Sequence, residues 1–208
     1  MRVLVMGASR GIGLEAIAAL IAHGHSPVGF SRTQPVTASP ACPWVVGDAL
    51  DATRVAAALD GVDAVIQCLG VSHKALLGPI SLFSEATDIL LGAMTRAGAS
   101  RLIAVTGFGA GRSRAAIPLW QKLPFELAFG RAYRDKDVQE RLITESGLDW
   151  TIVRPGVLSN GPRTDAYKVI ADPARWRNGL VSRKDVAAFL AQQVSSAEMV
   201  GKDVVIVR

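Results

Sequence analysis

The 208-residue sequence predicts an α/β fold: a doubly wound parallel sheet covered by helices on both faces, in three layers and a single domain. Strand-like and helix-like segments alternate along the chain, an order typical of parallel sheets with crossover helices. Half of the residues are hydrophobic and only 20% are charged, as expected for a sheet that is buried on both faces. The length suits one domain with a substantial core.

Short apolar runs predict the strands, and longer segments with helical periodicity predict the helices. The expected strands cover residues 3–6, 27–30, 45–46, 63–67, 102–106, 150–153 and 204–207. The expected helices begin at residue 11 and cover residues 51–59, 81–97, 134–145 and 183–194. Asp51 is predicted to cap its helix, and Gly147 to end the helix before it.

Two other segments are expected to lie on the substrate side of the domain. Residues 107–131 are rich in glycine and proline, and they are predicted as an irregular, lid-like loop. Residues 155–182 are predicted as a small C-terminal substrate-side region within the same domain, which spans residues 1–208.

The glycine-rich segment near the N-terminus predicts a dinucleotide site. One glycine follows the first strand, and two more open the next helix, in the pattern G-x-x-x-G-x-G. Glycine lets the backbone approach a phosphate, and a helix N-terminus offers unpaired N–H groups and a positive dipole end. An ordinary tight turn is the alternative. The residues expected to bind the cofactor here are Gly7, Ser9, Arg10, Gly11, Ile12 and Gly13.

The end of the second strand indicates which nicotinamide cofactor is preferred. An NAD site normally has an acidic residue there, which accepts hydrogen bonds from the ribose hydroxyls. This chain has Ser31 and Arg32 instead, and no acid lies between Glu15 and Asp48. Arg32 could bind a 2′-phosphate through charge-assisted hydrogen bonds, with Ser31 beside it. We therefore expect NADP(H) to be preferred over NAD(H); a solvated loop arginine is the alternative.

Motifs along nearly the whole chain resemble those of a known family. The matching segments are residues 5–13, 47–49, 101–106, 146–156, 182–189 and 201–204. With these motifs the chain resembles the atypical short-chain dehydrogenases/reductases, Rossmann proteins that bind NAD(P)H and include flavin reductase (biliverdin-IXβ reductase) and NmrA-like proteins. The resemblance implies adenine contacts from Asp48 and Ala49, and ribose and nicotinamide contacts from Leu69, Gly70, Pro155, Gly156 and Val157. Turn roles are the alternatives for Asp48 and for the 155–156 pair.

The catalytic motif of that lineage is not intact in this chain. Its main reductases use a serine and a Tyr-x-x-x-Lys pair, in which the ammonium lowers the pKa of the phenol and holds the ribose. Neither Tyr133 nor Tyr167 has a lysine four residues later. Lys136 falls at the position of the motif lysine, Ala132 replaces the tyrosine, and Thr106 could stand in for the serine. Thr106, Tyr133 and Lys136 are therefore the candidate catalytic residues; a surface aromatic and a solvated lysine are the alternatives for the last two.

The expected function is that of an NADPH-dependent reductase, which transfers hydride to a flat acceptor such as a flavin, a quinone or a conjugated carbonyl. His73, in the loop after the fourth strand, could also reach the crevice. A non-catalytic module that senses NADP(H) is the main alternative. A nucleotide-sugar epimerase or dehydratase fits less well, because such enzymes normally need the tyrosine and a larger substrate domain.

Composition argues against several other classes of protein. The net charge is +5, but the arginines are spread out and form no dense basic stripe, so nucleic acid is not an expected partner. Cys42 and Cys68 have no metal-ligand spacing, so no metal is expected. No apolar run is long enough to span a membrane. We expect a cytoplasmic monomer or small homo-oligomer whose partner is a small-molecule acceptor.

Overall fold

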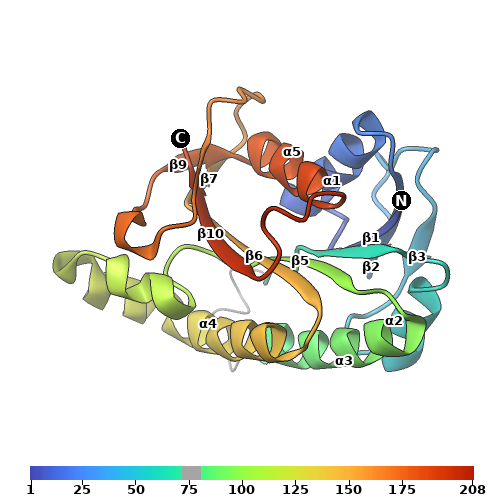
Figure 1. The fold of residues 1–208 in the computed structure, drawn as a ribbon, viewed down its shortest axis with the longest axis horizontal. Coiled ribbons are helices and arrows are strands. Elements are labelled where there is room, and N and C mark those ends of the chain that lie inside the picture. The colour runs from blue at the N-terminus through green and yellow to red at the C-terminus, as the bar shows by residue number, and fades with distance from the viewer. Residues whose placement is uncertain (72–80) are drawn as a thin grey trace.

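The protein is described here by a computed structural model, which covers residues 1–71 and 81–208. Its central sheet has eight strands in the order β3-β2-β1-β4-β5-β6-β10-β8 (Figure 1). The bounds are β1 Arg2–Met6, β2 Ser26–Ser31, β3 Trp44–Val46, β4 Ala64–Gln67, β5 Arg101–Val105, β6 Asp149–Pro155, β8 Lys168–Ile170 and β10 Lys202–Val207. All the paired strands run parallel except β8, which is antiparallel to β10.

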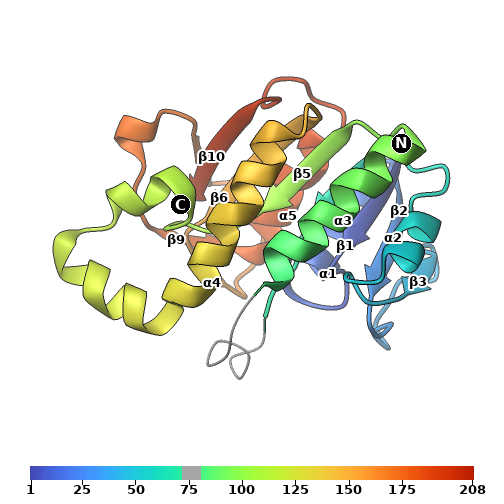
Figure 2. The ribbon, with the colours of Figure 1, turned by 90° about the horizontal axis from the view of Figure 1, so that it is seen from below.

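Helices cover both faces of this sheet, which confirms the three-layer, doubly wound prediction. Helices α1 (Gly11–Ala22) and α5 (Arg183–Gln193) lie on one face. Helices α2 (Ala52–Ala58), α3 (Leu82–Ala97) and α4 (Leu119–Glu145) lie side by side on the other (Figure 2). No helix of the described residues is long and apolar enough to cross a membrane.

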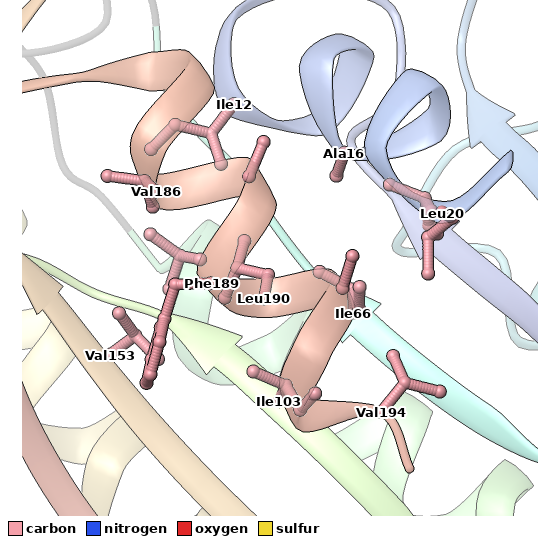
Figure 3. Packing of buried hydrophobic residues seen from close by; sticks show 14 of the residues in the cluster. Ile12, Ala16, Leu20, Ile66, Ile103, Val153, Val186, Phe189, Leu190 and Val194 are labelled. Carbon is pink, nitrogen blue, oxygen red and sulfur yellow. The ribbon is translucent and has the colours of Figure 1, made fainter. Parts of the chain in front are cut away.

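The core on the first face is formed by small and branched apolar side chains (Figure 3). Ile12, Ala16 and Leu20 of α1 recur at helical spacing and belong to one buried cluster with Val186 and Leu190 of α5. Buried strand residues support both helices from below, as expected for strands that are continuous apolar runs. Because α1 is fixed against the sheet along its length, its N-terminus is held at the carboxyl ends of the strands.

Local sequence signals account for several of the element boundaries. The Asp51 carboxylate accepts hydrogen bonds from the N–H groups of Thr53 (3.0 Å) and Arg54 (3.1 Å), so its predicted capping role is confirmed. Gly147 has a φ of +72° directly after α4, which confirms the predicted end of that helix.

The loop predicted over residues 107–131 is wrong in its second half. Helix α4 begins at Leu119 instead of Arg134, after a short 3-10 helix, η2 (Gly111–Ala116). Pro124 and Gly130 suggested an irregular segment, since both residues normally disfavour helix interiors. In the structure the helix continues through both residues, and an ion pair between Arg134 and Glu126 (2.5 Å), two turns apart, spans Gly130 on the helix surface.

Three short strands were not predicted from the sequence. Strands β7 (Val157–Ser159) and β9 (Leu180–Ser182) pair in parallel as a second, two-stranded sheet, and β8 adds the antiparallel edge. Each has three residues, too few for alternation to be recognised. The wholly parallel sheet is therefore corrected to a mostly parallel one, and all three strands fall within residues 155–182.

Candidate functional site

The glycine loop brings β1, α1 and β4 into close backbone contact. Gly7 has a φ of +88°, and its N–H donates to the Phe30 carbonyl (2.9 Å). A Cβ atom on Gly7 would lie 2.6 Å from the Cys68 carbonyl oxygen, and one on Gly13 would lie 2.3 Å from the Gly7 carbonyl oxygen. Neither glycine can gain a side chain without moving backbone, so the loop makes the close backbone approach that the glycine pattern predicted.

The N-terminus of α1 has the features of an anion site. Within the described residues, its N-cap Arg10 makes no side-chain capping bond and its first turn contains no acid. The positive end of the helix dipole is therefore not neutralised by a local carboxylate. Arg183, at the start of α5, lies beside Gly11, where an added Cβ would be 3.9 Å from its Nε atom. Asn160 accepts a hydrogen bond from Arg183 Nη1 (2.7 Å), so this guanidinium is held next to the loop.

Ser9 and Ile12 differ in what they present to that site. Ser9 is half-buried in the loop, whereas the side chain of Ile12 is buried in the core between α1 and α5. Only the backbone of Ile12 is therefore suited to contact a ligand. The role of Arg183 was missed in the sequence, because a residue some 170 positions from the loop gives no local signal.

At the end of β2, the structure separates the roles of Ser31 and Arg32. The buried Ser31 hydroxyl donates to the Thr33 carbonyl (2.7 Å) and accepts from Trp44 Nε1 (3.2 Å), so it fixes the turn. Arg32 is exposed at the surface of that turn. The Asp48 carboxylate accepts from the Leu50 N–H (3.0 Å), which is the turn role considered as its alternative.

The remaining residues expected at the cofactor also lie at strand ends. Ala49 is buried against the core, Leu69 is half-buried and Gly70 is exposed after β4. Gly156 packs closely on Gly179, whose carbonyl oxygen would lie 2.1 Å from an added Cβ. Pro155 is buried at the end of β6, and Val157 beyond it is 56% exposed. Their contacts with adenine, ribose and nicotinamide stay predictions.

Two polar contacts fix α4 against its neighbours. The Asp135 carboxylate accepts hydrogen bonds from the Phe83 N–H (2.8 Å), the Ser84 N–H (3.3 Å) and the Ser84 hydroxyl, so it caps the N-terminus of α3. The Gln139 side-chain amide donates to Gln67 Oε1 (2.9 Å), at the end of β4. The part of α4 around Asp135 and Gln139 is thereby held toward the ends of β4 and β5.

The three candidate catalytic residues lie at these strand ends. Thr106 directly follows β5, and its hydroxyl donates to Glu140 Oε1 of α4 (2.7 Å). The Tyr133 hydroxyl lies over Gly107, 2.8 Å from the position of an added Cβ. Lys136, only 8% exposed, places its ammonium 4.0 Å from the centre of the Phe83 ring. The alternatives of a surface aromatic and a solvated lysine therefore do not hold for Tyr133 and Lys136.

The electrostatics of this group differ from those of a Tyr-x-x-x-Lys pair. Burial raises the pKa of Tyr133, and the nearby charge of Glu140 raises it further. Burial lowers the pKa of Lys136 to about 8, although Glu140, Asp135 and Cys68 act in the opposite direction. Burial also raises the pKa of the Cys68 thiol to about 12. Tyr133 is therefore a neutral phenol suited to donating a hydrogen bond, and the charge beside it is negative.

A buried ionic cluster next to the site was missed in the sequence. Arg154, whose side chain is 2% exposed, lies between Glu140 (Nη2–Oε2, 2.7 Å) and Asp203 (Nη1–Oδ2, 2.7 Å). Its guanidinium stacks 4.8 Å from the centre of the Trp176 ring. Glu140 lies four residues after Lys136 and so shares its helix face, which was the available signal. A cavity of about 230 Å³ adjoins these three charged residues. His73 lies outside the described residues.

The glycine loop joins the parallel strand β1 to the uncapped helix α1, at the edge where the strands of the central sheet have their carboxyl ends. This arrangement defines a dinucleotide-binding protein of the Rossmann class. The chain belongs to the NAD(P)H-binding family, whose sequence model matches residues 7–197. The family resemblance expected from the motifs is thereby confirmed.

Solved structures and curated relatives agree with this assignment. The chain is similar to ChuY, described as an anaerobillin reductase from Escherichia coli O157:H7, with 26% identity, a TM-score of 0.82, and coverage of 100% of this chain and 97% of that one. It shares the fold of a short-chain dehydrogenase/reductase from Veillonella parvula solved with NADP, with 16% identity, a TM-score of 0.82, and coverage of 100% and 94%.

Among the curated proteins, a 3-beta-hydroxysteroid dehydrogenase from Mycolicibacterium neoaurum is 29% identical over 185 residues, which cover 81% of this chain and 50% of that one. The chain spans between 12% and 50% of the length of the curated relatives it matches.

Proposed function

We propose that this chain is an NADPH-dependent reductase that delivers hydride to a flat, conjugated acceptor. The observation that carries the proposal is that the uncapped glycine loop and the group Thr106, Tyr133 and Lys136 occupy the same edge of the sheet. The likeness to an anaerobillin reductase across 100% of the chain supports a reductase.

The residues present fit a nicotinamide dinucleotide. The close backbone packing at Gly7 and Gly13 fixes the turn that leads into α1, the N-terminus of α1 offers N–H groups of its first turn to a phosphate, and Arg10 and Arg183 add positive charge. When bound, the cofactor supplies the hydride. We expect Lys136, in its charged form, to hold ribose hydroxyls, and Pro155 and Val157 to support the nicotinamide ring.

Toward the acceptor, the chain offers one hydrogen-bond donor and one acceptor. Tyr133, as a neutral phenol, donates its hydrogen to an oxygen or nitrogen of the acceptor molecule. The hydrogen of the Thr106 hydroxyl is engaged by Glu140, so Thr106 presents lone pairs. For acceptors such as flavins and quinones, positioning beside the nicotinamide supplies much of the rate enhancement, and the proton can come from water.

The test of the proposal is consumption of NADPH by the purified protein, against a panel of flavins, quinones, linear tetrapyrroles and aldehydes. Enzyme-dependent oxidation with one acceptor class supports the reductase and identifies the class. Tight NADPH binding without turnover on any acceptor favours instead a cofactor-sensing module, to which the incomplete Tyr-x-x-x-Lys motif also points.

We expect Arg32→Ala to weaken NADPH binding about ten- to one-hundred-fold, the value of one or two charge-assisted hydrogen bonds, and to leave NADH binding nearly unchanged. The reason is that the 2′-phosphate is the only difference between the two cofactors, and Arg32 is the exposed cation at the end of β2. Fluorescence titration of both cofactors measures the ratio.

Two further variants serve as controls for Arg32. Arg96→Ala removes a cation in the last turn of α3 and should change neither affinity. Arg183→Ala removes a cation beside the phosphate loop and should weaken both cofactors to a similar degree. Equal losses for NADPH and NADH in Arg32→Ala contradict the proposed role of this residue.

A further inference from the structure

Glu140 is the residue that connects the candidate site to the buried ionic cluster. Its Oε1 atom accepts hydrogen bonds from the Thr106 hydroxyl (2.7 Å) and from Arg154 Nε (3.1 Å), and its Oε2 atom accepts from Arg154 Nη2 (2.7 Å). Gly111 packs against the same carboxylate, so closely that an added Cβ would lie 2.0 Å from Oε2. The Glu140 side chain is therefore enclosed and is held in one orientation.

The partner of Glu140 is itself immobile. Arg154 is bonded on its other side to Asp203 and stacks on Trp176, and Asp203 is also bonded to Arg112. Two parallel bonds to a fixed guanidinium hold a carboxylate in one orientation. The Glu140 carboxylate is thus fixed on the α4 face that carries Tyr133 and Lys136.

This charge acts on both candidate residues. Among the residues that the structure describes, the charged and titratable groups that face Lys136 are Glu140 and Asp135 from α4 and Cys68 after β4, and the Phe83 ring covers it from α3. Glu140 raises the pKa of Lys136 against the effect of burial, and it also adds to the rise in the pKa of Tyr133. Glu140 therefore favours the protonated forms of both side chains, together with burial at Tyr133 and with Asp135 and Cys68 at Lys136.

We propose that Glu140 is a positioning residue for the reduction: held by Arg154, it orients the Thr106 hydroxyl and presents a carboxylate on the helix face of Lys136 and Tyr133. The proposal rests on the proposed reductase function. In the Tyr-x-x-x-Lys arrangement, a lysine cation lowers the pKa of the tyrosine phenol. In this chain, the Glu140 carboxylate near Tyr133 acts on the phenol in the opposite direction.

The test is Glu140→Gln, which keeps an oxygen that can accept from Thr106 and removes the charge. The pH at which NADPH binding and turnover decline with rising pH should move down by on the order of one pH unit, because an adjacent opposite charge shifts a titration by this amount or more. Turnover at neutral pH should fall by about ten-fold, the low end of what one group contributes to proton transfer or orientation.

Asp203→Asn is the matched control. It removes the other carboxylate of Arg154, so it disturbs the same cluster, but Asp203 is bonded to Arg112 and Arg154 and not to Thr106. We expect this variant to lose stability and to keep the wild-type pH profile. If both variants shift the pH profile equally, Glu140 acts only through the integrity of the cluster, and the proposal is overturned.

Two measurements keep the test independent of turnover and of folding defects. The titration of Lys136 is followed by NMR of ¹³Cε-labelled lysine, with Lys136→Arg to assign the signal, and it should move to lower pH in Glu140→Gln. This readout remains valid if no acceptor is found, so failure of the reductase proposal is distinguishable from failure of this one. Should Glu140→Gln not fold, Thr106→Val leaves the Glu140–Arg154 pair in place: lower turnover with an unchanged Lys136 titration supports the proposal, and wild-type turnover overturns it.

Discussion

Replacing Arg154 with methionine should lower the free energy of unfolding by about 3–5 kcal/mol at neutral pH, because removal of one partner leaves buried charges uncompensated. Arg154 is bonded to Glu140 and Asp203 within a side-chain environment that is nearly closed to solvent. Methionine fills much of the same space, so the loss reports on the charges and not on a cavity. Urea unfolding followed by tryptophan fluorescence measures it.

The pH dependence of this loss gives a second check. Burial alone would raise the pKa of Asp203, but Arg112 and Arg154 hold it below its ordinary value. In the wild type, the bonds of Asp203 to these arginines therefore stabilise the fold at pH values above the ordinary pKa of an aspartate. This contribution is lost as the pH falls through the lowered pKa of Asp203. In Arg154→Met that dependence weakens, so the two proteins should become more alike in stability as the pH falls below 3.8, the ordinary pKa of an aspartate.

Asp203→Asn is the control here too, with a smaller loss, since Arg154 retains Glu140. A loss below about 1 kcal/mol in Arg154→Met, the range of an exposed ion pair, would mean that water in the adjoining cavity hydrates the two carboxylates. The cluster would then be a hydrated surface feature and not a buried support of α4.

The sheet, the glycine loop and most element boundaries could be predicted because they depend on local patterns. Val3 to Met6 is a continuous apolar run, Asp51 caps the helix it precedes, and Gly7 and Gly13 mark a close backbone approach. Each of these signals is contained within about one turn or one strand, and the tertiary structure does not override it.

The first half of α4 and the ionic cluster could not be predicted, because their causes lie elsewhere in the chain. Gly107 and Gly111 indicated a flexible lid, but in the structure they make room for the Tyr133 hydroxyl and the Glu140 carboxylate. Arg154 sits in a predicted buried strand, and its charge is matched by Glu140 and by Asp203 from β10. No spacing rule connects such positions before the fold is known.

Replacement of Lys136 is the other change for which we expect a large effect on the free energy of unfolding, and its sign is opposite to that of Arg154→Met. Replacing Lys136 with methionine should raise the free energy of unfolding by about 3 kcal/mol at pH 7, since the difference between a pKa of 10.5 and one of about 8 corresponds to this energy. The charged amine is destabilised by burial, and the thioether is not. NADPH binding should weaken in the same variant, because the ammonium proposed to hold the ribose is gone.

The sign of the pH dependence follows from proton binding. Below pH 8, Lys136 is charged in both the folded and the unfolded chain, and the full destabilisation is present. Between about pH 8 and 10.5 the folded chain binds fewer protons than the unfolded chain, so the contribution of Lys136 to stability rises with pH. The stability difference between Lys136→Met and the wild type should therefore shrink across this range. Comparing the two proteins removes most of the opposing effect of Cys68, because burial raises its pKa in both and Lys136 lowers it only in part in the wild type.

Lys184→Met is the matched control, because Lys184 is an exposed lysine on α5 and its replacement should change stability by less than about 0.5 kcal/mol. A destabilised Lys136→Met would show that the ammonium contributes more through Glu140 and Phe83 than burial removes. If Lys136→Met is more stable than the wild type but binds the cofactor more weakly, the Lys136 ammonium lowers the stability of the fold and strengthens cofactor binding. This result is expected of a residue that acts on a ligand and not on the fold.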